Sequence, residues 1–131
     1  MASSLVRHSP PPLSSRRDVV QRTEAFLRAR LSESVSIAQL CRVAGVSERS
    51  LRNAFYDVRG MSPKRCALRA RLAEVRRALT AAHVTRGAVT VIATDHGFFV
   101  LGRFASTYKA VYGESPSDTL RGHDEREALA S

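Results

Sequence analysis

The sequence predicts an all-α protein built around a tandem pair of helix-turn-helix units. Apolar residues recur at one-face helical spacing along most of the chain, as at Phe104, Tyr108 and Val111. Two short helical patterns meet at Gly45, and two more meet at Gly97. Glycine accepts the positive φ that a sharp turn between helices requires. Each glycine turn therefore predicts one helix-turn-helix unit.

A repeat relates the two units. A shift of 53 residues aligns residues 108–116 with residues 55–63, including the Gly-x-Ser-Pro that ends both runs. A shift of 52 residues aligns Gly97 with Gly45. Since the shift changes by one within the turn, we expect the second copy to carry one extra turn residue. The repeat has a long period and occurs only twice, which predicts a pair of related units rather than a solenoid.

Two motifs carry a family resemblance. Residues 97–116 read G-F-x4-R-F-x3-Y-K-x2-Y-G-x-S-P, and residues 37–55 read I-A-x-L-C-x2-A-G-V-S-x-R-x-L-x3-F. The first motif resembles the signature of the AraC/XylS transcription regulators, and the second resembles the first helix-turn-helix of that family. The match extends over roughly residues 16–121. It implies an all-helical DNA-binding domain of about seven helices, in which one long helix joins two helix-turn-helix units.

The charge favours nucleic acid as the partner. The chain carries 21 Lys and Arg residues against 12 Asp and Glu residues, a formal net charge of +9. Thirteen basic and four acidic residues lie between Arg42 and Lys109, so the repeated region alone carries +9. Arginine-rich composition by itself is also typical of soluble proteins from GC-rich genomes. The concentration of the charge on the repeat favours double-stranded DNA.

Other functional classes lack their motifs. The sequence holds no Ser/His/Asp arrangement, no phosphate-cradling glycine loop and no metal-ligand cluster, and Asp95-His96 is an isolated pair inside a turn. We therefore expect no enzymatic activity, no metal and no cofactor. Cys41 and Cys66 fall at apolar helical positions, which predicts buried, reduced thiols in a cytoplasmic protein. No apolar run reaches the roughly 20 residues that span a bilayer, so we expect no membrane association.

The folded part is expected to begin at Ser15, after a disordered Pro-rich tail or linker stump at residues 1–14. Ser15 has N-cap character, and Asp18 stands in the capping-box position. The first unit is expected over about residues 15–62. Within it, Ser36 is predicted to cap the first helix of the helix-turn-helix.

The first recognition helix is predicted at about residues 47–57, with Ser47 as its N-cap. Its exposed face carries Arg49, Arg52 and Asn53, which we predict to contact DNA bases. Arginine can donate two hydrogen bonds to guanine O6 and N7, and asparagine can pair in the same bidentate way with adenine. Solvated surface residues are the alternative interpretation, and alignment with the base-reading positions of the AraC/XylS family favours DNA contact. Ser36 and Ser47 are predicted to contact phosphate.

A connecting helix is predicted at about residues 63–82, with Ser62 as N-cap and Pro63 in the first turn. A helix of that size is roughly 30 Å long, close to the about 34 Å of one DNA turn. It would hold the two recognition helices in successive major-groove segments. One apolar stripe comprises Leu68, Leu72, Val75 and Leu79, and a mostly solvated face comprises Arg65, Arg69, Arg76 and Arg77.

The second unit is expected over about residues 88–121, with a recognition helix at about residues 101–111. Hydrophobic residues occupy positions 99–101, where polar caps are common, and Gly102 weakens the first turn. We predict that the first unit carries most of the sequence reading and that the second mainly positions the protein. The outward residues Arg103, Ser106 and Thr107 are predicted base contacts, with unspecialised surface as the alternative for the last two, and Thr90 and Lys109 are predicted phosphate contacts.

A short helix at residues 117–121 is expected to close the second unit, followed by a charged tail at residues 122–131. We predict a sequence-specific, DNA-binding transcriptional regulator that is monomeric, cytoplasmic and associated with the bacterial nucleoid. Its expected partners are double-stranded DNA and RNA polymerase. The alternatives are a DNA-binding fragment of a larger ligand-responsive regulator and a non-specific basic nucleic-acid-binding protein. Dimerisation modules and membrane-surface peptides also use basic amphipathic helices, but the matched turn glycines disfavour both.

Overall fold

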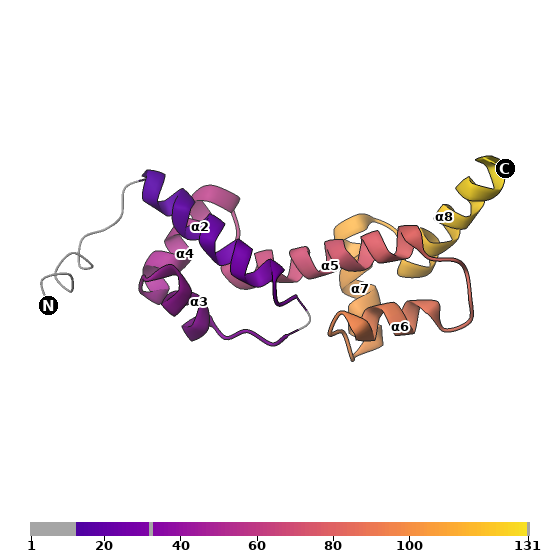
Figure 1. Cartoon of the computed structure of the whole chain (residues 1–131), viewed down its shortest axis with the longest axis horizontal. Coiled ribbons are helices and arrows are strands. Elements are labelled where there is room, and N and C mark those ends of the chain that lie inside the picture. The colour runs from indigo at the N-terminus through magenta and orange to yellow at the C-terminus, as the bar shows by residue number, and fades with distance from the viewer. Residues whose placement is uncertain (1–12, 32, 131) are drawn as a thin grey trace, which may run out of the picture. The chain divides into compact units, whose positions relative to one another are not determined.

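A computed structural model describes the backbone of residues 13–31 and 33–130, and the side chains of residues 15–31, 33–122 and 129. This part of the chain contains seven helices and no strand, which confirms the all-α prediction. The helices are α2 (Leu13–Arg28), α3 (Ile37–Ala44), α4 (Glu48–Arg59), α5 (Pro63–Ala81), α6 (Ala88–Asp95), α7 (Leu101–Tyr112) and α8 (Pro116–Ala130) (Figure 1).

Both ends of the chain differ from the prediction. Helix α2 begins at Leu13, so Ser15 lies inside its first turn and is not the N-cap residue. Residues 1–12 of the expected tail lie outside the described residues. At the other end, α8 continues to Ala130 instead of ending at residue 121. Gly122 follows the expected end of α8 and is a common helix stop signal, yet the helix continues through it.

The first compact unit extends to Leu68. Helix α2 packs on both α3 and α4 (Figure 1). Two ion pairs join α4 back to α2: Arg59 donates to both Glu24 carboxylate oxygens at 2.7 Å, and Arg16 pairs with Asp57. The core side chains are Val19, Val20, Leu27, Leu40, Ala44, Leu51, Ala54 and Phe55.

Local signals set the ends of α3 and α4. Ser36 forms a capping box with Gln39: the Gln39 N–H donates to Ser36 Oγ at 3.2 Å, and the Ser36 N–H donates to Gln39 Oε1 at 2.9 Å. Gly45 ends α3 with φ 71°, in the left-handed region that glycine favours. Ser47 then caps α4 by accepting a hydrogen bond from the Ser50 N–H at 3.2 Å. The predicted roles of Ser36, Gly45 and Ser47 in the turn are confirmed.

Helix α5 begins as its sequence indicates. Ser62 Oγ accepts from the Arg65 N–H at 3.1 Å, and Pro63 takes the first helical position, where the missing N–H costs nothing. The early residues Cys66 and Ala67 pack against the core of the first unit. From Arg69 onward the helix belongs to the second unit, in which Leu72, Val75 and Leu79 are fully buried.

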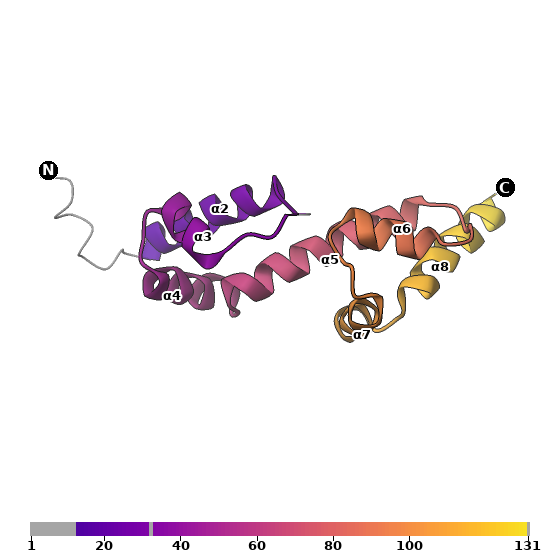
Figure 2. The same cartoon turned by 90° about the horizontal axis from the view of Figure 1, so that it is seen from below.

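The second unit combines the later part of α5 with α6, α7 and α8 (Figure 2). Its core contains a ladder of aromatic rings, in which Phe98 and Phe104 have ring centroids 4.9 Å apart. The ladder continues from Phe104 to Tyr108 at 5.9 Å and from Tyr108 to Tyr112 at 4.8 Å. Phe98 is half-buried, with its ring packed against that of Phe104. Arg71 lies over its ring at 5.5 Å.

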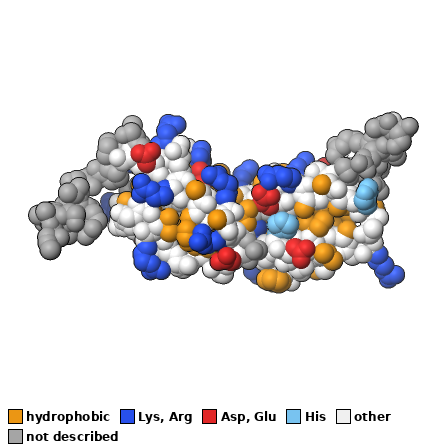
Figure 3. Space-filling view, viewed as in Figure 1, with side chains coloured by type: hydrophobic (Ala, Val, Ile, Leu, Met, Phe, Trp, Pro, Cys, Tyr) orange, Lys and Arg blue, Asp and Glu red, His pale blue; other side chains and the backbone are white. Residues whose placement is uncertain are grey.

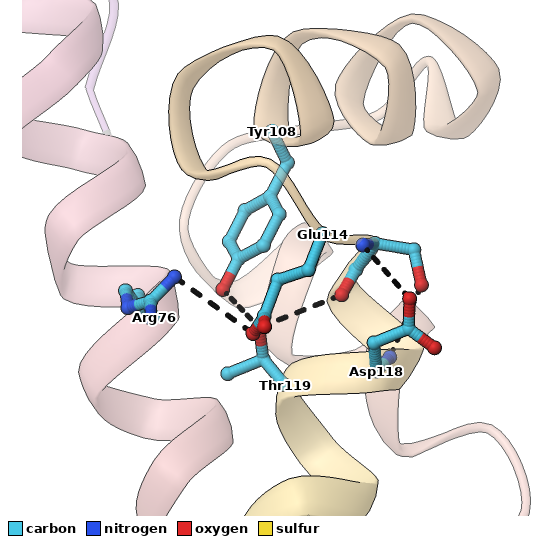
Figure 4. Close-up of polar contacts among 6 residues, drawn as sticks. Arg76, Tyr108, Glu114, Asp118 and Thr119 are labelled. Atoms are coloured by element: carbon cyan, nitrogen blue, oxygen red, sulfur yellow. Dashed lines mark hydrogen bonds and ion pairs between the residues drawn. The ribbon is translucent and has the colours of Figure 1, made fainter.

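A partly buried polar cluster lies beside this ladder (Figure 4). Thr119 Oγ1 donates to the Glu114 carboxylate and lies 2.8 Å from the Tyr108 hydroxyl. Because Thr119 has a single hydroxyl hydrogen, Tyr108 is the donor in the second of these bonds. Arg76 stacks over the Tyr112 ring at 4.5 Å, with its Nη1 3.9 Å from Glu114. The expectation that Arg76 belongs to a solvated face is therefore wrong.

The turn of the second unit is longer than that of the first. The Phe98 N–H donates to the Ala93 carbonyl at 2.9 Å, as the Val46 N–H does to the Cys41 carbonyl at 3.2 Å. The residues that form these two equivalent bonds are 52 positions apart in the sequence. The N-cap residues Ser47 and Val100 are 53 positions apart. The one extra residue predicted from the repeat is therefore Phe99, whose side chain is 75% exposed.

Two further findings concern the thiols and the membrane. Cys41 and Cys66 are half-buried, not fully buried as expected, and they form no disulfide. Each packs against the core of the first unit. In the described residues, no helix combines the length and the apolar character needed to cross a membrane.

Candidate nucleic-acid interface

One face of α4 gathers the strongest predicted site residues. Leu51, Ala54 and Phe55 point into the core and have no exposed surface, which turns the opposite side of the helix to solvent. Arg49, Arg52 and Asn53 are all exposed on that side. Together with Glu48 they line one open hollow in the surface of the helix. The structure therefore brings the three predicted base contacts of the first unit together.

Glu48 is a member of this group that the sequence prediction missed. Its Oε2 atom lies 2.6 Å from Nη2 of Arg52, one helical turn further on. Both side chains are about half exposed, at 51% for Glu48 and 54% for Arg52. The missed signal was the spacing itself, because an acidic residue four positions before a basic one favours an ion pair on a helix.

The thiol of Cys41 lies close enough to this ion pair to respond to it. Burial raises the pKa of Cys41 most, the Glu48 carboxylate raises it further, and Arg52 lowers it. In the second unit, Leu101 and Ala105 take the equivalent positions, so that surface carries no such pair.

The exposed face of α7 has a different character. Arg103 and Ser106 are exposed as predicted, but Thr107 is half-buried. Its equivalent in the first unit is the buried Ala54, so Thr107 lies at the edge of the packed side and is not fully outward. Three consecutive hydrophobic side chains are exposed where the helix begins, with values of 75% for Phe99, 62% for Val100 and 37% for Leu101.

The start of α7 also lacks the cap that α4 has. Val100 is the N-cap residue and makes no side-chain hydrogen bond to the helix. The first turn therefore keeps N–H groups without a capping side chain. Leu101 is exposed at this helix start.

The predicted phosphate contacts lie at different helix ends. Ser36 and Ser47 use their hydroxyl oxygens as N-caps, so a phosphate would compete with or extend those bonds. Thr90 is exposed in the first turn of α6. Lys109 is exposed in the last turn of α7, where a cation also complements the helix dipole. Basic side chains spread over the described face drawn in Figure 3.

Side chains that could perform other chemistry are engaged elsewhere. His96 ends α6, and its Nδ1 lies 2.8 Å from the Ile92 carbonyl, which gives this residue a structural role in the turn. Across the described residues, no three His, Cys, Asp or Glu side chains cluster closely enough to hold a metal ion.

Comparison with known proteins identifies the family. A helix-turn-helix domain model matches residues 40–122, more than half of the chain. A probable AraC family transcriptional regulator from Rhodopseudomonas palustris has a solved structure with 34% identity and a TM-score of 0.71, covering 81% of this chain and 97% of that one. The chain belongs to the AraC/XylS family. Both turn regions and both recognition helices fall within the matched segment.

Two further comparisons define the extent of the likeness. The XylDLEGF operon transcriptional activator of Pseudomonas putida is 38% identical over 101 residues, which cover 77% of this chain and 32% of the relative. The chain thus spans about a third of the length of that protein. The DNA-binding domain of AdpA, solved in complex with a target DNA, shares the fold with a TM-score of 0.69 at 20% identity, over 82% of this chain and 94% of that one.

Proposed function

We propose that this AraC/XylS-family chain binds double-stranded DNA in a sequence-specific manner and thereby regulates transcription. The observation that carries the proposal is the exposed face of α4, where Arg49, Arg52 and Asn53 share one hollow on the second helix of a helix-turn-helix. Guanidinium and carboxamide groups are the side chains that pair bidentately with guanine and adenine in the major groove. The second helix of this motif is the one that enters that groove.

The length of α5 supports contact with two segments of the major groove. Its 19 residues correspond to about 28 Å at 1.5 Å per residue. One turn of DNA is about 34 Å, so the dimensions of the connecting helix suit α4 and α7 entering successive segments. The basic surplus over residues 42–109 supplies attraction to phosphate along the same duplex.

The proposed roles of the two recognition helices differ. Arg49, Arg52 and Asn53 of α4 read bases, supported by their exposure on a helix with a capped start. Arg103 and Ser106 of α7 lie beside bases, and Thr107 contributes only through its exposed edge. Contacts to phosphate are assigned to Ser36, Ser47, Thr90 and Lys109, all of which are exposed.

The wider biological setting follows from the relatives. Because a relative from Pseudomonas putida is named as an operon activator, we propose activation, with RNA polymerase as a second partner. The chain matches only about a third of that relative, so a ligand-responsive domain elsewhere in the same polypeptide is compatible with this proposal. The described part is proposed to bind as a monomer, in the cytoplasm where the bacterial chromosome lies.

Selection of binding sites from random duplex DNA tests the proposal. The wild-type protein should enrich a defined sequence containing at least one guanine that Arg52→Ala no longer selects. Arg65→Ala, which removes an exposed arginine of α5, is the matched control and should leave the enriched sequence unchanged. Enrichment of no sequence by the wild-type protein would instead identify a non-specific basic nucleic-acid-binding protein.

A further inference from the structure

Glu48 is the one acidic side chain in the hollow formed with Arg49, Arg52 and Asn53. A carboxylate at this position opposes the approach of DNA phosphates, so attraction to DNA in general does not account for its presence. The fold does not require it either. The equivalent residue of the second unit is Leu101, on a helix of the same length with the same buried register.

We propose that Glu48 is a positioning residue that sets the base specificity of Arg52. Glu48 Oε2 lies 2.6 Å from one guanidinium nitrogen of Arg52, Nη2. A guanidinium carries five N–H donors, more than one carboxylate contact uses. An exposed arginine otherwise samples many rotamers, all of which must be given up when it forms a bidentate contact. Held by Glu48, Arg52 has less rotamer freedom to lose. This inference rests on the proposed function of α4.

The same carboxylate also disfavours binding to DNA sequences other than the preferred one. Near a phosphate that makes no contact with Arg52, Glu48 contributes repulsion without any compensating contact. Discrimination between DNA sequences depends on such unfavourable interactions as well as on favourable ones. Glu48 should therefore lower affinity for DNA in general while raising the ratio between the preferred sequence and other sequences.

Helix stabilisation is the competing role, because an acidic residue in the first turn interacts favourably with the helix dipole. Ser47 already caps this end through Ser50, so the start of α4 does not depend on Glu48 alone. The two roles make different predictions for DNA discrimination.

The experiment compares Glu48→Gln and Glu48→Asp with the wild-type chain. Glu74→Gln is the matched control, because Glu74 forms an ion pair of the same 2.6 Å length with Arg77 on α5, outside the hollow. Dissociation constants are measured for the selected duplex, for a duplex in which the guanine assigned to Arg52 is replaced, and for a scrambled duplex. Thermal unfolding of each variant reports on folding.

Glu48→Gln should bind the scrambled duplex about 2- to 5-fold more tightly, since one like charge is removed from the interface. Its preference for the guanine should fall by about 3- to 10-fold, less than the loss from removing Arg52 itself. Glu48→Asp, which keeps the charge on a shorter side chain, should restore part of the preference. Glu74→Gln should keep the wild-type preference.

Several results would overturn the inference. An unchanged guanine preference in Glu48→Gln, while Arg52→Ala loses it, would overturn the positioning role and leave the proposed function standing. Loss of preference for a cytosine instead would show that Glu48 reads a base directly. Equal weakening on all duplexes with a lower melting temperature would show a purely structural role. A wild-type protein without any sequence preference would overturn the proposed function, and this inference with it.

Discussion

The recognition helices α4 and α7 have the same packing and different surfaces. Both contain 12 residues, and both end at a glycine with left-handed φ. Their buried residues lie in the same register, since Leu51 corresponds to Phe104 and Phe55 corresponds to Tyr108. On the exposed side, a shift of 53 pairs charged or amide residues of α4 with apolar or small residues of α7. These pairs are Glu48 with Leu101, Arg49 with Gly102, Arg52 with Ala105, and Asn53 with Ser106.

This difference shows that core and surface of a repeated unit can diverge independently. The core register determines how the helix is held, because a one-position slip would expose the aromatic anchors. The exposed register determines what the helix can recognise. A capped start with paired side chains on α4 suits hydrogen-bonded base reading. An uncapped, apolar start on α7 suits contact with surfaces that offer methyl groups or phosphate.

The largest expected effect is a loss of stability from core substitutions, which test whether each unit depends on its own core. Leu51→Ala in the first unit and Leu72→Ala in the second each remove a leucine with no exposed surface. Each should destabilise the protein by about 2–5 kcal/mol. Hydrogen exchange resolved by segment should show faster exchange only within the unit that carries the substitution. Faster exchange in both units after either substitution would contradict the separation of the two cores.

The next largest effect is expected on DNA binding, when the arginines of the two recognition helices are replaced in turn. Arg52→Ala should cost about 1–3 kcal/mol on the preferred DNA sequence and relax the base preference at one position. Arg103→Ala should weaken binding with little change in base preference, because α7 begins without a side-chain cap. Binding-site selection with both variants measures the difference. A base preference erased by Arg103→Ala and kept by Arg52→Ala would reverse the proposed roles.

A smaller effect on stability is expected at the core position where the first unit has Phe55 and the second unit has Tyr108. Tyr108→Phe makes the second copy match Phe55 of the first and removes the bond to Thr119. Thr119 still donates to Glu114, so no buried group loses its only partner, and the cost should be about 1 kcal/mol. Chemical unfolding at pH 7 measures it. A cost above about 3 kcal/mol would show that Thr119 depends on Tyr108.

The pH dependence of the same position provides a further test. Burial raises the pKa of Tyr108 above its ordinary value, so the folded state holds this proton more tightly than the unfolded state. The resulting stability is present below the unfolded pKa of about 10 and is lost as the pH rises through the folded pKa. Unfolding experiments from about pH 9 to about pH 11 bracket this value. Over that range the free energy of unfolding should fall more steeply for the wild type than for Tyr108→Phe. Equal slopes would contradict the assignment.

The smallest effect concerns an exposed cation at the end of α7. Lys109→Ala should weaken binding to all duplexes about equally and reduce the slope of log affinity against log salt by roughly one. In the first unit, the equivalent position is the exposed Tyr56, so Tyr56→Ala should leave this salt slope unchanged. Binding measured over a series of salt concentrations separates the two. An unaltered slope for Lys109→Ala would exclude its phosphate contact.

The sequence alone predicted the helix-turn-helix elements because their signals are local. Gly45, Ser36 and Ser47 act on backbone groups within a few residues, so their roles follow from spacing. The repeat also predicted one extra turn residue, which is Phe99 in the structure. For the candidate site, helical periodicity was enough to predict the exposure of Arg49, Arg52 and Asn53. Their contact with DNA stays a prediction.

Tertiary structure decided the features that depend on segments distant in the sequence. Arg76 looks like a surface residue of α5 until Tyr112 and Glu114 are packed against it. Thr107 and Ser106 are neighbours in the sequence, yet only the flank that carries Thr107 is partly covered. The pairs of Arg59 with Glu24 and of Arg16 with Asp57 both join α2 to α4, between residues that are 35 and 41 positions apart in the sequence. Burial and ion pairing depend on which elements lie alongside a helix, and periodicity within that helix carries no information about its neighbours.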